Sequence, residues 1–278
     1  MTGLTGNFCR ERLDLLAGHF EEMYRCYNRP QYVDPDPVSV VRRYGSLADR
    51  EVAAVVASCL AYGRATQIVK SVRIVLDPMG DSPAEYIVRS SPRDIRDLCE
   101  GFRHRFTDAG DLYDLLFSIR TILIDHGSIE TVFSSGYSGR PGSVIEGLSR
   151  LSGALRSASG SRKNSLLPDI SLGSACKRYN LFLKWMVRND GIDPGGWTCV
   201  TPAELLIPLD THMHRICLEL GLVRRKAADM GAVIEATESF RLIAPEDPTR
   251  YDFTLTRFGI RPDLRVSDLI EQCSHVPV

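Results

Sequence analysis

The sequence lacks a hydrophobic run long enough to cross a bilayer. Its longest apolar stretch is Val52–Leu60, which Ser58 already interrupts, whereas a membrane-spanning helix needs about 20 predominantly apolar residues. The first twenty residues carry four charged side chains and no apolar segment typical of a secretory signal. We therefore expect a cytoplasmic protein with no membrane partner.

Closely spaced cysteines are also missing. The eight cysteines stand at positions 9, 26, 59, 99, 176, 199, 217 and 273, and no two lie within four residues of each other. Zinc and iron–sulfur sites usually take thiolates from pairs such as C-x-x-C. His212 and His214 cannot hold a metal together either, since residues two apart on a helix point to different faces. We expect no metal and no other cofactor, and reduced, mostly buried thiols.

The chain has no bias toward charge of one sign. Its 278 residues include 34 basic and 35 acidic side chains, a formal net charge of −1. A nucleic-acid partner would therefore need a local basic surface. With 44% hydrophobic and 25% charged residues, the composition is that of a globular protein with one large domain or two smaller ones.

What the sequence does contain is helical periodicity along most of its length. Apolar residues recur at three- and four-residue spacing, with a capping residue such as Ser46 before a helix or Gly221 after one. Neither a strand–helix alternation nor an Asn-Gly hairpin interrupts this pattern. The predicted helices are Glu11–Tyr27, Ser46–Tyr62, Ala65–Leu76, Pro83–Val88, Arg93–Cys99, Asp111–Asp125, Val144–Arg156, Ser174–Arg188, Pro202–Leu206, Thr211–Leu220, Lys226–Ile243, Thr249–Phe258 and Pro262–Cys273.

The predicted fold is therefore all-α, with the whole chain forming a single two-lobed helical domain. We expect lobes near residues 30–156 and 173–260, with the terminal helices packing back on them. A Ser- and Gly-rich loop follows the first lobe at Ser157–Gly173. With its basic residues Arg162 and Lys163, this loop is either a lid over a nucleic acid or a solvent-exposed connection.

The predicted helix at Ser174–Arg188 combines basic and aromatic side chains. Lys177, Lys184 and Arg188 stand at i, i+7 and i+11 and share one helix face, while Trp185 and its aromatic and apolar neighbours point largely elsewhere. A basic stripe backed by an aromatic core suits a helix that follows a phosphate backbone. The alternative is a solvated charged face.

Two residues at predicted helix starts could take part in a reaction. Lys177 lies in a first turn, where the positive end of the helix dipole and the adjacent Arg178 disfavour an ammonium. The neutral, nucleophilic amine is more accessible in such a place. Asp210 precedes the next helix in the segment Pro208–His212 and is predicted as its N-cap. Capping alone is the alternative role for this aspartate.

These residues lie in segments that resemble the helix-hairpin-helix DNA glycosylase superfamily, which includes endonuclease III and the 8-oxoguanine glycosylases. LDTHMHRICLELGL looks like the aspartate segment of that superfamily, and RRYGSLADREVAAVVASCLAYGRATQIVKSVRIVL is similar to its first core helices. The chain most closely resembles a family of glycosylase-like proteins marked by LAYGR, ACKR.N.FL.WMVR, PLD.H..R and DP..YDF. It matches these motifs at Leu60–Arg64, Ala175–Arg188, Pro208–Arg215 and Asp247–Phe253, and the likeness covers residues 30 to 260.

The helix-hairpin-helix element is degenerate in this chain. The superfamily usually reads L-P-G-V-G-x-K-T-A, whereas the counterpart here is LGSACKR at 172–178, with one glycine. Lys177 and Asp210 are 33 positions apart, further than in the endonuclease III type, whose four-cysteine cluster is also missing. Archaeal 8-oxoguanine glycosylases share the degenerate hairpin and the long insertion and are the nearer analogy. Lys184 is the competing lysine, two turns into the helix and away from its positive end.

The resemblance implies a DNA repair glycosylase with AP-lyase activity in base excision repair. Its partner would be double-stranded DNA with an abasic site or a damaged base, such as the oxidised purine 8-oxoguanine. Lys177 is implied as the nucleophile that forms a Schiff base, assisted by Asp210. The substrate-binding residues expected from the analogy and the basic stripe are Tyr62, Arg64, Gln67, Arg178, Lys184, Arg188, Trp185 and His212.

Other interpretations stay open. A monofunctional glycosylase would use Asp210 to activate water and Lys177 to contact phosphate. A non-catalytic nucleic-acid-binding protein on the same scaffold, or an unrelated helical scaffold protein, needs neither role. For Trp185 and Trp197 the alternative to base recognition is burial in the core. We expect a monomer.

Overall fold

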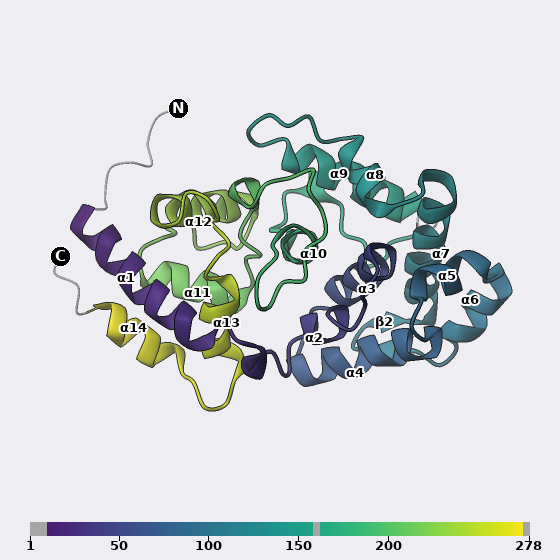
Figure 1. Ribbon diagram of the computed structural model, residues 1–278, viewed down its shortest axis with the longest axis horizontal. Helices are drawn as coiled ribbons and strands as arrows, with labels where there is room; N and C mark the ends of the chain where they lie inside the picture. Colours follow the sequence, from purple (N-terminus) through teal and green to yellow (C-terminus); the bar gives the residue numbers. More distant parts are fainter. Residues whose placement is uncertain (1–9, 158–161, 275–278) are drawn as a thin grey trace. The chain divides into compact units, whose positions relative to one another are not determined.

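The computed structural model describes residues 10–157 and 162–274, and their regular secondary structure is almost entirely α-helical (Figure 1). The all-α prediction is confirmed, with one short two-stranded hairpin as the exception within the described ranges. No helix in these ranges is long and apolar enough to span a membrane.

The chain divides into two compact units. The first unit holds residues 10–32, 173–184 and 201–274. The second holds residues 185–200 together with the described part of 33–172. Each unit draws on segments that are far apart in the sequence, so neither forms from a single stretch of chain.

The helices of the first unit surround a core of aliphatic and aromatic side chains. Phe20 lies in this core, with ring centroids 5.8 Å from Phe240 and 5.5 Å from Tyr251. Burying an aromatic side chain of this size contributes about 1.5–3 kcal/mol. The elements are α1 (Arg10–Tyr27), the first part of α10 (Lys177–Val187), α11 (Thr211–Glu219), α12 (Met230–Ile243), α13 (Asp252–Ile260) and α14 (Val266–Ser274), with 3-10 turns at Pro30–Tyr32 and Pro202–Glu204.

Helix α11 shows how local signals set helix limits. It begins after Asp210, whose side chain caps it, and ends at Glu219. Gly221, two residues later, has φ +74°. A left-handed residue at this place commonly stops a helix, and glycine adopts it without strain. The predicted cap and the predicted stop are both confirmed.

The second unit is organised around α3 (Leu47–Cys59). Its residues from Val52 to Cys59 are all buried, and the small side chains of its alanines let neighbouring helices approach closely. The other elements are α2 (Val38–Val41), α4 (Ala65–Leu76), η2 (Asp77–Met79), α5 (Pro83–Arg89), α6 (Pro92–Cys99), β1 (Arg103–His104), β2 (Thr107–Asp108), α7 (Ala109–His126), α8 (Ile129–Ser134), α9 (Val144–Arg156) and η4 (Ile170–Leu172).

Glu51 of α3 is a fully buried carboxylate that joins three segments of this unit. Its oxygens accept hydrogen bonds from the backbone N–H groups of Ile129 and Glu130 at the start of α8, and from Nε1–H of Trp197. Burial raises the pKa of Glu51 above its ordinary value, and the three hydrogen-bond donors offset only part of this rise. Trp197 is 3% exposed, so the structure favours core packing over base recognition for this tryptophan.

Helix α3 ends at Cys59 rather than at the predicted Tyr62. The carbonyl of Tyr62 lies 3.0 Å from Nε2 of His104 in β1, and Gly63 turns the chain with φ +98°. The helix therefore ends early because a tertiary hydrogen bond holds the backbone that would have continued it.

The β1–β2 hairpin was not predicted. Its strands pair Arg103 with Asp108 and His104 with Thr107, and the chain reverses through Arg105 and Phe106. Arg105 has φ +55°, a conformation usually taken by Gly, Asn or Asp in tight hairpins. The absence of those residues removed the usual sequence signal.

Further differences concern helix starts and short helices. α12 begins at Met230 rather than near Lys226, because the side chain of Asp229 caps it. α13 begins at Asp252 rather than at Thr249, which instead closes a turn with Asp247. The short helices α2 and α8 were not predicted, since so few residues cannot show helical periodicity.

The loop at Ser157–Gly173 is tied to α7 over much of its described part, while residues 158–161 lie outside the described ranges. Nη1 of Arg162 lies 3.1 Å from Oδ1 of Asp111, and Nη2 bonds to Asp114. Asn164 donates to the carbonyl of Asp111 at 2.9 Å. The charge of Arg162 is thus paired with two carboxylates of α7, while 46% of its side chain remains exposed to solvent.

Candidate active site

Helix α10 begins at Lys177 rather than at the predicted Ser174, so Lys177 lies in the first turn as predicted, and the backbone before it is unusual. Gly173 has φ +75° and Cys176 has φ +46°. A left-handed backbone is uncommon for a residue other than glycine, and such strained positions cluster at functional sites. The carbonyl of Cys176 accepts from the N–H groups of Tyr179 and Asn180, so the helix starts directly after this turn.

Contacts with the start of α12 hold this turn in place. The backbone N–H of Met230 donates to the carbonyl of Gly173 at 3.0 Å. Ser174 forms an isolated antiparallel β-bridge with Asp229. Because the turn is tied to a second element, the position of the Lys177 backbone does not depend on α10 alone.

Asp210 is fixed by the helix that it caps. Its Oδ1 accepts hydrogen bonds from the backbone N–H groups of His212 and Met213, both at 2.9 Å. A carboxylate at this end of a helix also interacts favourably with the helix dipole. Capping occupies Oδ1 and sets the direction of Oδ2.

The fold brings together the two residues predicted as catalytic. Nζ of Lys177 lies 3.9 Å from Oδ2 of Asp210, and the side chains are 26% and 22% exposed. This separation is longer than a hydrogen bond, and solvent reaches both groups. An amine and a carboxylate held in this way can act on one electrophilic centre, the amine as nucleophile and the carboxylate as electrostatic support.

His212 lies beside this pair and packs against α13. A Cβ on Gly259 would fall on the imidazole ring of His212, so the absence of a side chain at Gly259 makes room for the ring. His212 is an exposed residue. Cys217, two residues before the end of α11, is fully buried, and burial together with the charges of Asp252 and Asp210 raises its pKa. Its thiol is therefore held in the neutral, unreactive form.

Lys184, the competing lysine, is in a different environment. Its Nζ lies 3.4 Å from Oδ2 of Asp252, and the side chains are only 2% and 6% exposed. Asp252 is therefore buried in an ion pair. Arg178, the second residue of α10, is half-buried. The buried pair corrects the prediction that Lys184 presents its charge on a phosphate-binding stripe.

Arg188 and Trp185 belong to the second unit, and they too are buried. Arg188 is paired with Asp193 and, at 2.9 Å, with Asp190. Only 3% of Arg188 and 2% of Trp185 is exposed. The predicted basic stripe was wrong in this respect: of its three members, only Lys177 reaches the surface. Helical spacing places side chains on one face but does not say whether that face is covered.

Tyr62, Arg64 and Gln67, three of the residues expected to bind the substrate, lie at or just after the turn between α3 and α4. Arg64 and Gln67 are exposed at the start of α4. Tyr62 is half-buried, and its hydroxyl donates to the carbonyl of His104 at 2.9 Å. Its ring stacks on that of Phe106 with centroids 5.4 Å apart and planes 13° apart. Phe106 was missed by the sequence analysis because it lies in the unpredicted hairpin.

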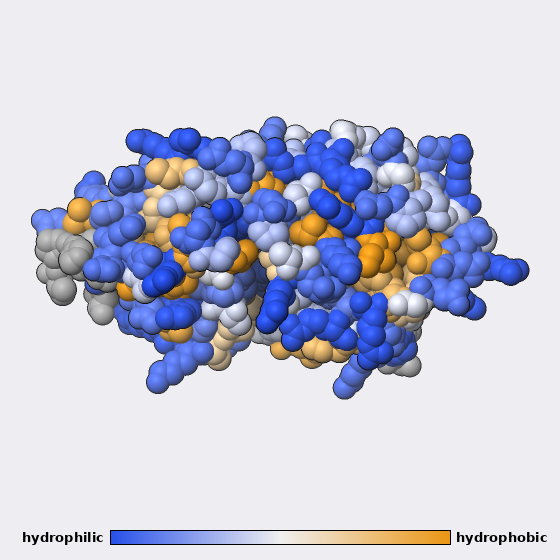
Figure 2. Space-filling view, turned by 90° about the horizontal axis from the view of Figure 1, so that it is seen from below, coloured by the Kyte–Doolittle hydropathy of each residue, from blue (hydrophilic) through white to orange (hydrophobic). Residues whose placement is uncertain are grey.

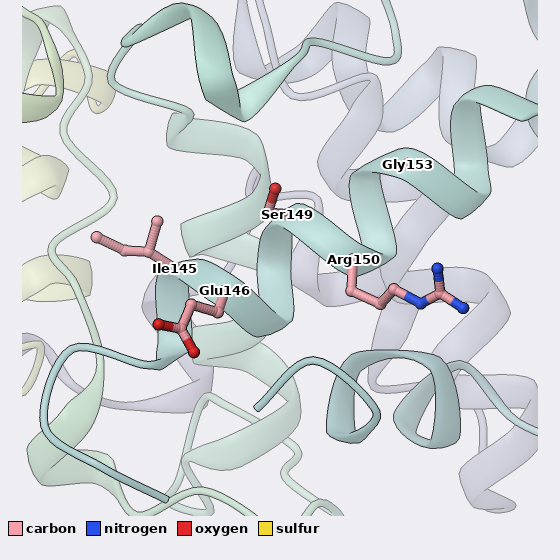
Figure 3. A pocket seen from close by; sticks show the side chains of 5 residues that line it. All are labelled: Ile145, Glu146, Ser149, Arg150 and Gly153. Carbon is pink, nitrogen blue, oxygen red and sulfur yellow. The ribbon is translucent and has the colours of Figure 1, made fainter. Parts of the chain in front are cut away.

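A surface hollow on α9 is separate from all of these residues. It has a volume of about 500 Å³ and is lined by Ile145, Glu146, Ser149, Arg150 and Gly153 (Figure 3). Figure 3 shows the side chains spread along one helix, with no second element contributing a polar group. Within the described residues, no group of three or more His, Cys, Asp or Glu side chains is placed to hold a metal ion.

Comparison with known proteins gives one match. A family described as "Protein of unknown function (DUF2400)" matches residues 36–261, which is most of the chain. The matched region includes both Lys177 and Asp210. No curated protein and no solved structure matches.

Proposed function

The chain belongs to the DUF2400 family of proteins of unknown function, and we propose that it is a DNA repair glycosylase with AP-lyase activity. One observation carries this proposal. Lys177 and Asp210 are 33 positions apart in the sequence, yet Nζ and Oδ2 lie 3.9 Å apart at two helix starts that solvent can reach. The resemblance of both segments to helix-hairpin-helix glycosylases supports it. We propose the two-lobed glycosylase fold for the chain on the same grounds.

The proposed substrate is double-stranded DNA that carries a damaged base or an abasic site. An enzyme cannot reach a base inside the duplex, so the nucleotide must first rotate out at a cost of a few kcal/mol. This cost is lower where the base is damaged or missing, which favours recognition of damaged and abasic sites. The resemblance to archaeal enzymes favours an oxidised purine such as 8-oxoguanine.

In the proposed reaction, the neutral amine of Lys177 attacks C1′ of the deoxyribose. The bond between C1′ and the base breaks, and the base leaves with the electron pair and takes up a proton. Positive charge builds on the sugar during this step, and the carboxylate of Asp210 stabilises it electrostatically. Loss of a proton from Nζ and opening of the sugar ring give an imine, which permits β-elimination of the 3′ phosphate.

Borohydride trapping tests this proposal. The protein is incubated with duplexes that contain 8-oxoguanine or a preformed abasic site, and hydride addition converts any imine into a stable protein–DNA adduct. We expect an adduct with the wild-type chain and none with Lys177→Gln. In Asp210→Asn the amide still caps α11 but the charge is lost, so trapping should fall roughly a hundred-fold or more.

Lys226→Gln is the matched control, because Lys226 is an exposed lysine of the same unit and its removal should leave trapping unchanged. An adduct that survives Lys177→Gln would assign the nucleophile to another amine and contradict the proposal. Release of the base without any adduct would instead indicate a monofunctional glycosylase in which Asp210 activates water. If neither base release nor an adduct is seen on either duplex, the enzymatic proposal falls.

A further inference from the structure

Phe106 stands out on the surface of the second unit. It lies at the tip of the β1–β2 hairpin with 68% of its surface exposed, and it alone is exposed among the described Phe, Tyr and Trp residues. On the face of the molecule shown in Figure 2, hydrophobic residues form small groups among hydrophilic ones. A large aromatic ring that stays exposed to water at such a tip suggests that a binding partner covers it when the protein functions.

The residues beneath Phe106 are held firmly. The ring of Tyr62 stacks on it, and the Tyr62 hydroxyl donates to the carbonyl of His104. Nε2 of His104 lies 3.0 Å from the carbonyl of Tyr62, and Nδ1 lies 2.9 Å from Oγ of Ser71. A carbonyl only accepts, so Nε2 carries the proton and Nδ1 of the neutral ring accepts from Ser71. This network joins the hairpin to the turn before α4 and leaves the exposed ring on a rigid support.

The surroundings of Phe106 carry positive charge. Arg105 has its guanidinium carbon 5.5 Å from the centre of the Phe106 ring, and its side chain lies against Gly63. Arg64, next to Gly63, is exposed. Arg103 lies opposite Asp108 in the register of the hairpin. Arg64 and Arg105 therefore give a local positive charge in a protein whose formal net charge is −1.

We propose that Phe106 is a stacking site for an unpaired base of a nucleic acid strand, with Arg105 and Arg64 contacting the phosphates beside it. An exposed aromatic face with flanking arginines is the combination by which proteins bind single strands, because every base offers a π-face and every linkage a negative charge. Tyr62 then supports the stacking ring from below rather than contacting the base. This inference concerns binding alone and does not rest on the proposed chemistry at Lys177.

The test uses a short undamaged single strand that contains 2-aminopurine, whose fluorescence is quenched when it stacks on an aromatic ring. We expect Phe106→Ala to bind about ten-fold more weakly and to lose the quenching, and Phe106→Trp to retain both. Arg105→Gly suits the backbone at φ +55° and removes the whole side chain together with its positive charge. It should reduce the dependence of affinity on salt, as expected for the loss of one phosphate contact.

Two control variants in the same unit make the result specific. Ile74→Ala removes an apolar side chain that is 52% exposed but carries no aromatic ring. Tyr113→Leu removes a half-buried ring that also stacks on an aromatic, Phe117, and lies near Arg96. Neither should change the quenching. Circular dichroism of each variant confirms that the fold is retained.

Wild-type affinity and quenching in a folded Phe106→Ala variant would overturn the proposal and leave the ring to a protein partner. An equal loss in Ile74→Ala or Tyr113→Leu would also overturn it, since the effect would then not belong to the hairpin. Failure of borohydride trapping combined with Phe106-dependent quenching would remove the glycosylase proposal and leave this site standing. The two proposals therefore fail separately.

Discussion

Helix α10 carries two lysine–aspartate pairs that share their chemistry and differ in burial. Lys177 and Lys184 are seven residues apart on this helix, and each faces an aspartate at the start of another helix. Lys177 is 3.9 Å from Asp210 with about a quarter of each side chain exposed, whereas Lys184 is 3.4 Å from Asp252 with almost nothing exposed. Similar residues at similar positions thus lie in two different environments.

This difference in exposure distinguishes a pair that a substrate can reach from a pair that stabilises the fold. Burying two charges costs several kcal/mol of desolvation, which their attraction offsets only while both partners are present. A pair that solvent reaches contributes less to stability, because water and ions screen it. Lys177 and Asp210 are therefore available to a substrate at small cost, and we expect Lys184 and Asp252 to matter most for folding.

The largest expected effect is on the free energy of unfolding, which should respond very differently to changes in the two pairs. Lys184→Met should lower the free energy of unfolding by about 3–5 kcal/mol, because it leaves the Asp252 carboxylate buried without its lysine. Lys177→Met should lower it by less than about 1 kcal/mol. Urea unfolding followed by circular dichroism measures both values. Equal losses of unfolding free energy in the two variants would contradict the proposed difference between the pairs.

A double variant sharpens this test. Lys184→Met combined with Asp252→Leu removes both charges and should recover much of the lost stability, since no uncompensated charge stays in the core. A double variant no more stable than Lys184→Met would show that packing, rather than charge, holds this region together.

A smaller effect should follow from disturbing the neighbour of the exposed pair. Gly259→Ala places a methyl group on the ring of His212 and should lower the free energy of unfolding by about 1–3 kcal/mol. Gly18→Ala in α1 is the matched control, because no atom lies within 4 Å of the added group. That change should stabilise the chain by about 0.5–1 kcal/mol. Equal melting curves for the two variants would contradict the packing of His212.

The smallest effect concerns pH and a buried group of the second unit. Burial lowers the pKa of His104 below its ordinary value of 6.5. As pH falls, the unfolded chain therefore takes up a proton before the native state does. The stability contributed by His104 is fully present above pH 6.5 and is lost as pH falls toward the lower native pKa.

His104→Asn should reduce the loss of unfolding free energy on acidification, measured by urea titrations above and below pH 6.5. Identical pH profiles for His104→Asn and the wild-type chain would contradict the prediction that protonation of His104 contributes to the loss of stability in acid.

Local signals in the sequence were sufficient for most helices. α4 and α9 have the predicted limits, and the cap and stop of α11 lie where Asp210 and Gly221 predicted them. Capping and left-handed glycines act through hydrogen bonds and sterics within a few residues. The hairpin at Arg103–Asp108 was missed because its turn depends on contacts with distant residues such as Ser71 and Tyr62.

For the candidate site, the residue types and their places at helix starts could be read in the chain. Lys177 in the first turn of α10 and Asp210 as the cap of α11 follow from spacing and local chemistry. Burial could not be read in the same way. Lys184 and Arg188 fit a basic stripe as well as Lys177 does, yet both are covered and paired with carboxylates.

The sequence alone therefore specified an all-α chain and placed a lysine and an aspartate at two helix starts. Only the tertiary structure brought those side chains to 3.9 Å, buried the second lysine beside Asp252, and left Phe106 exposed on a rigid hairpin. The physical reason is one of range. Hydrogen bonds along a helix act over about four residues, whereas burial depends on segments that are distant in the chain and meet only when it folds.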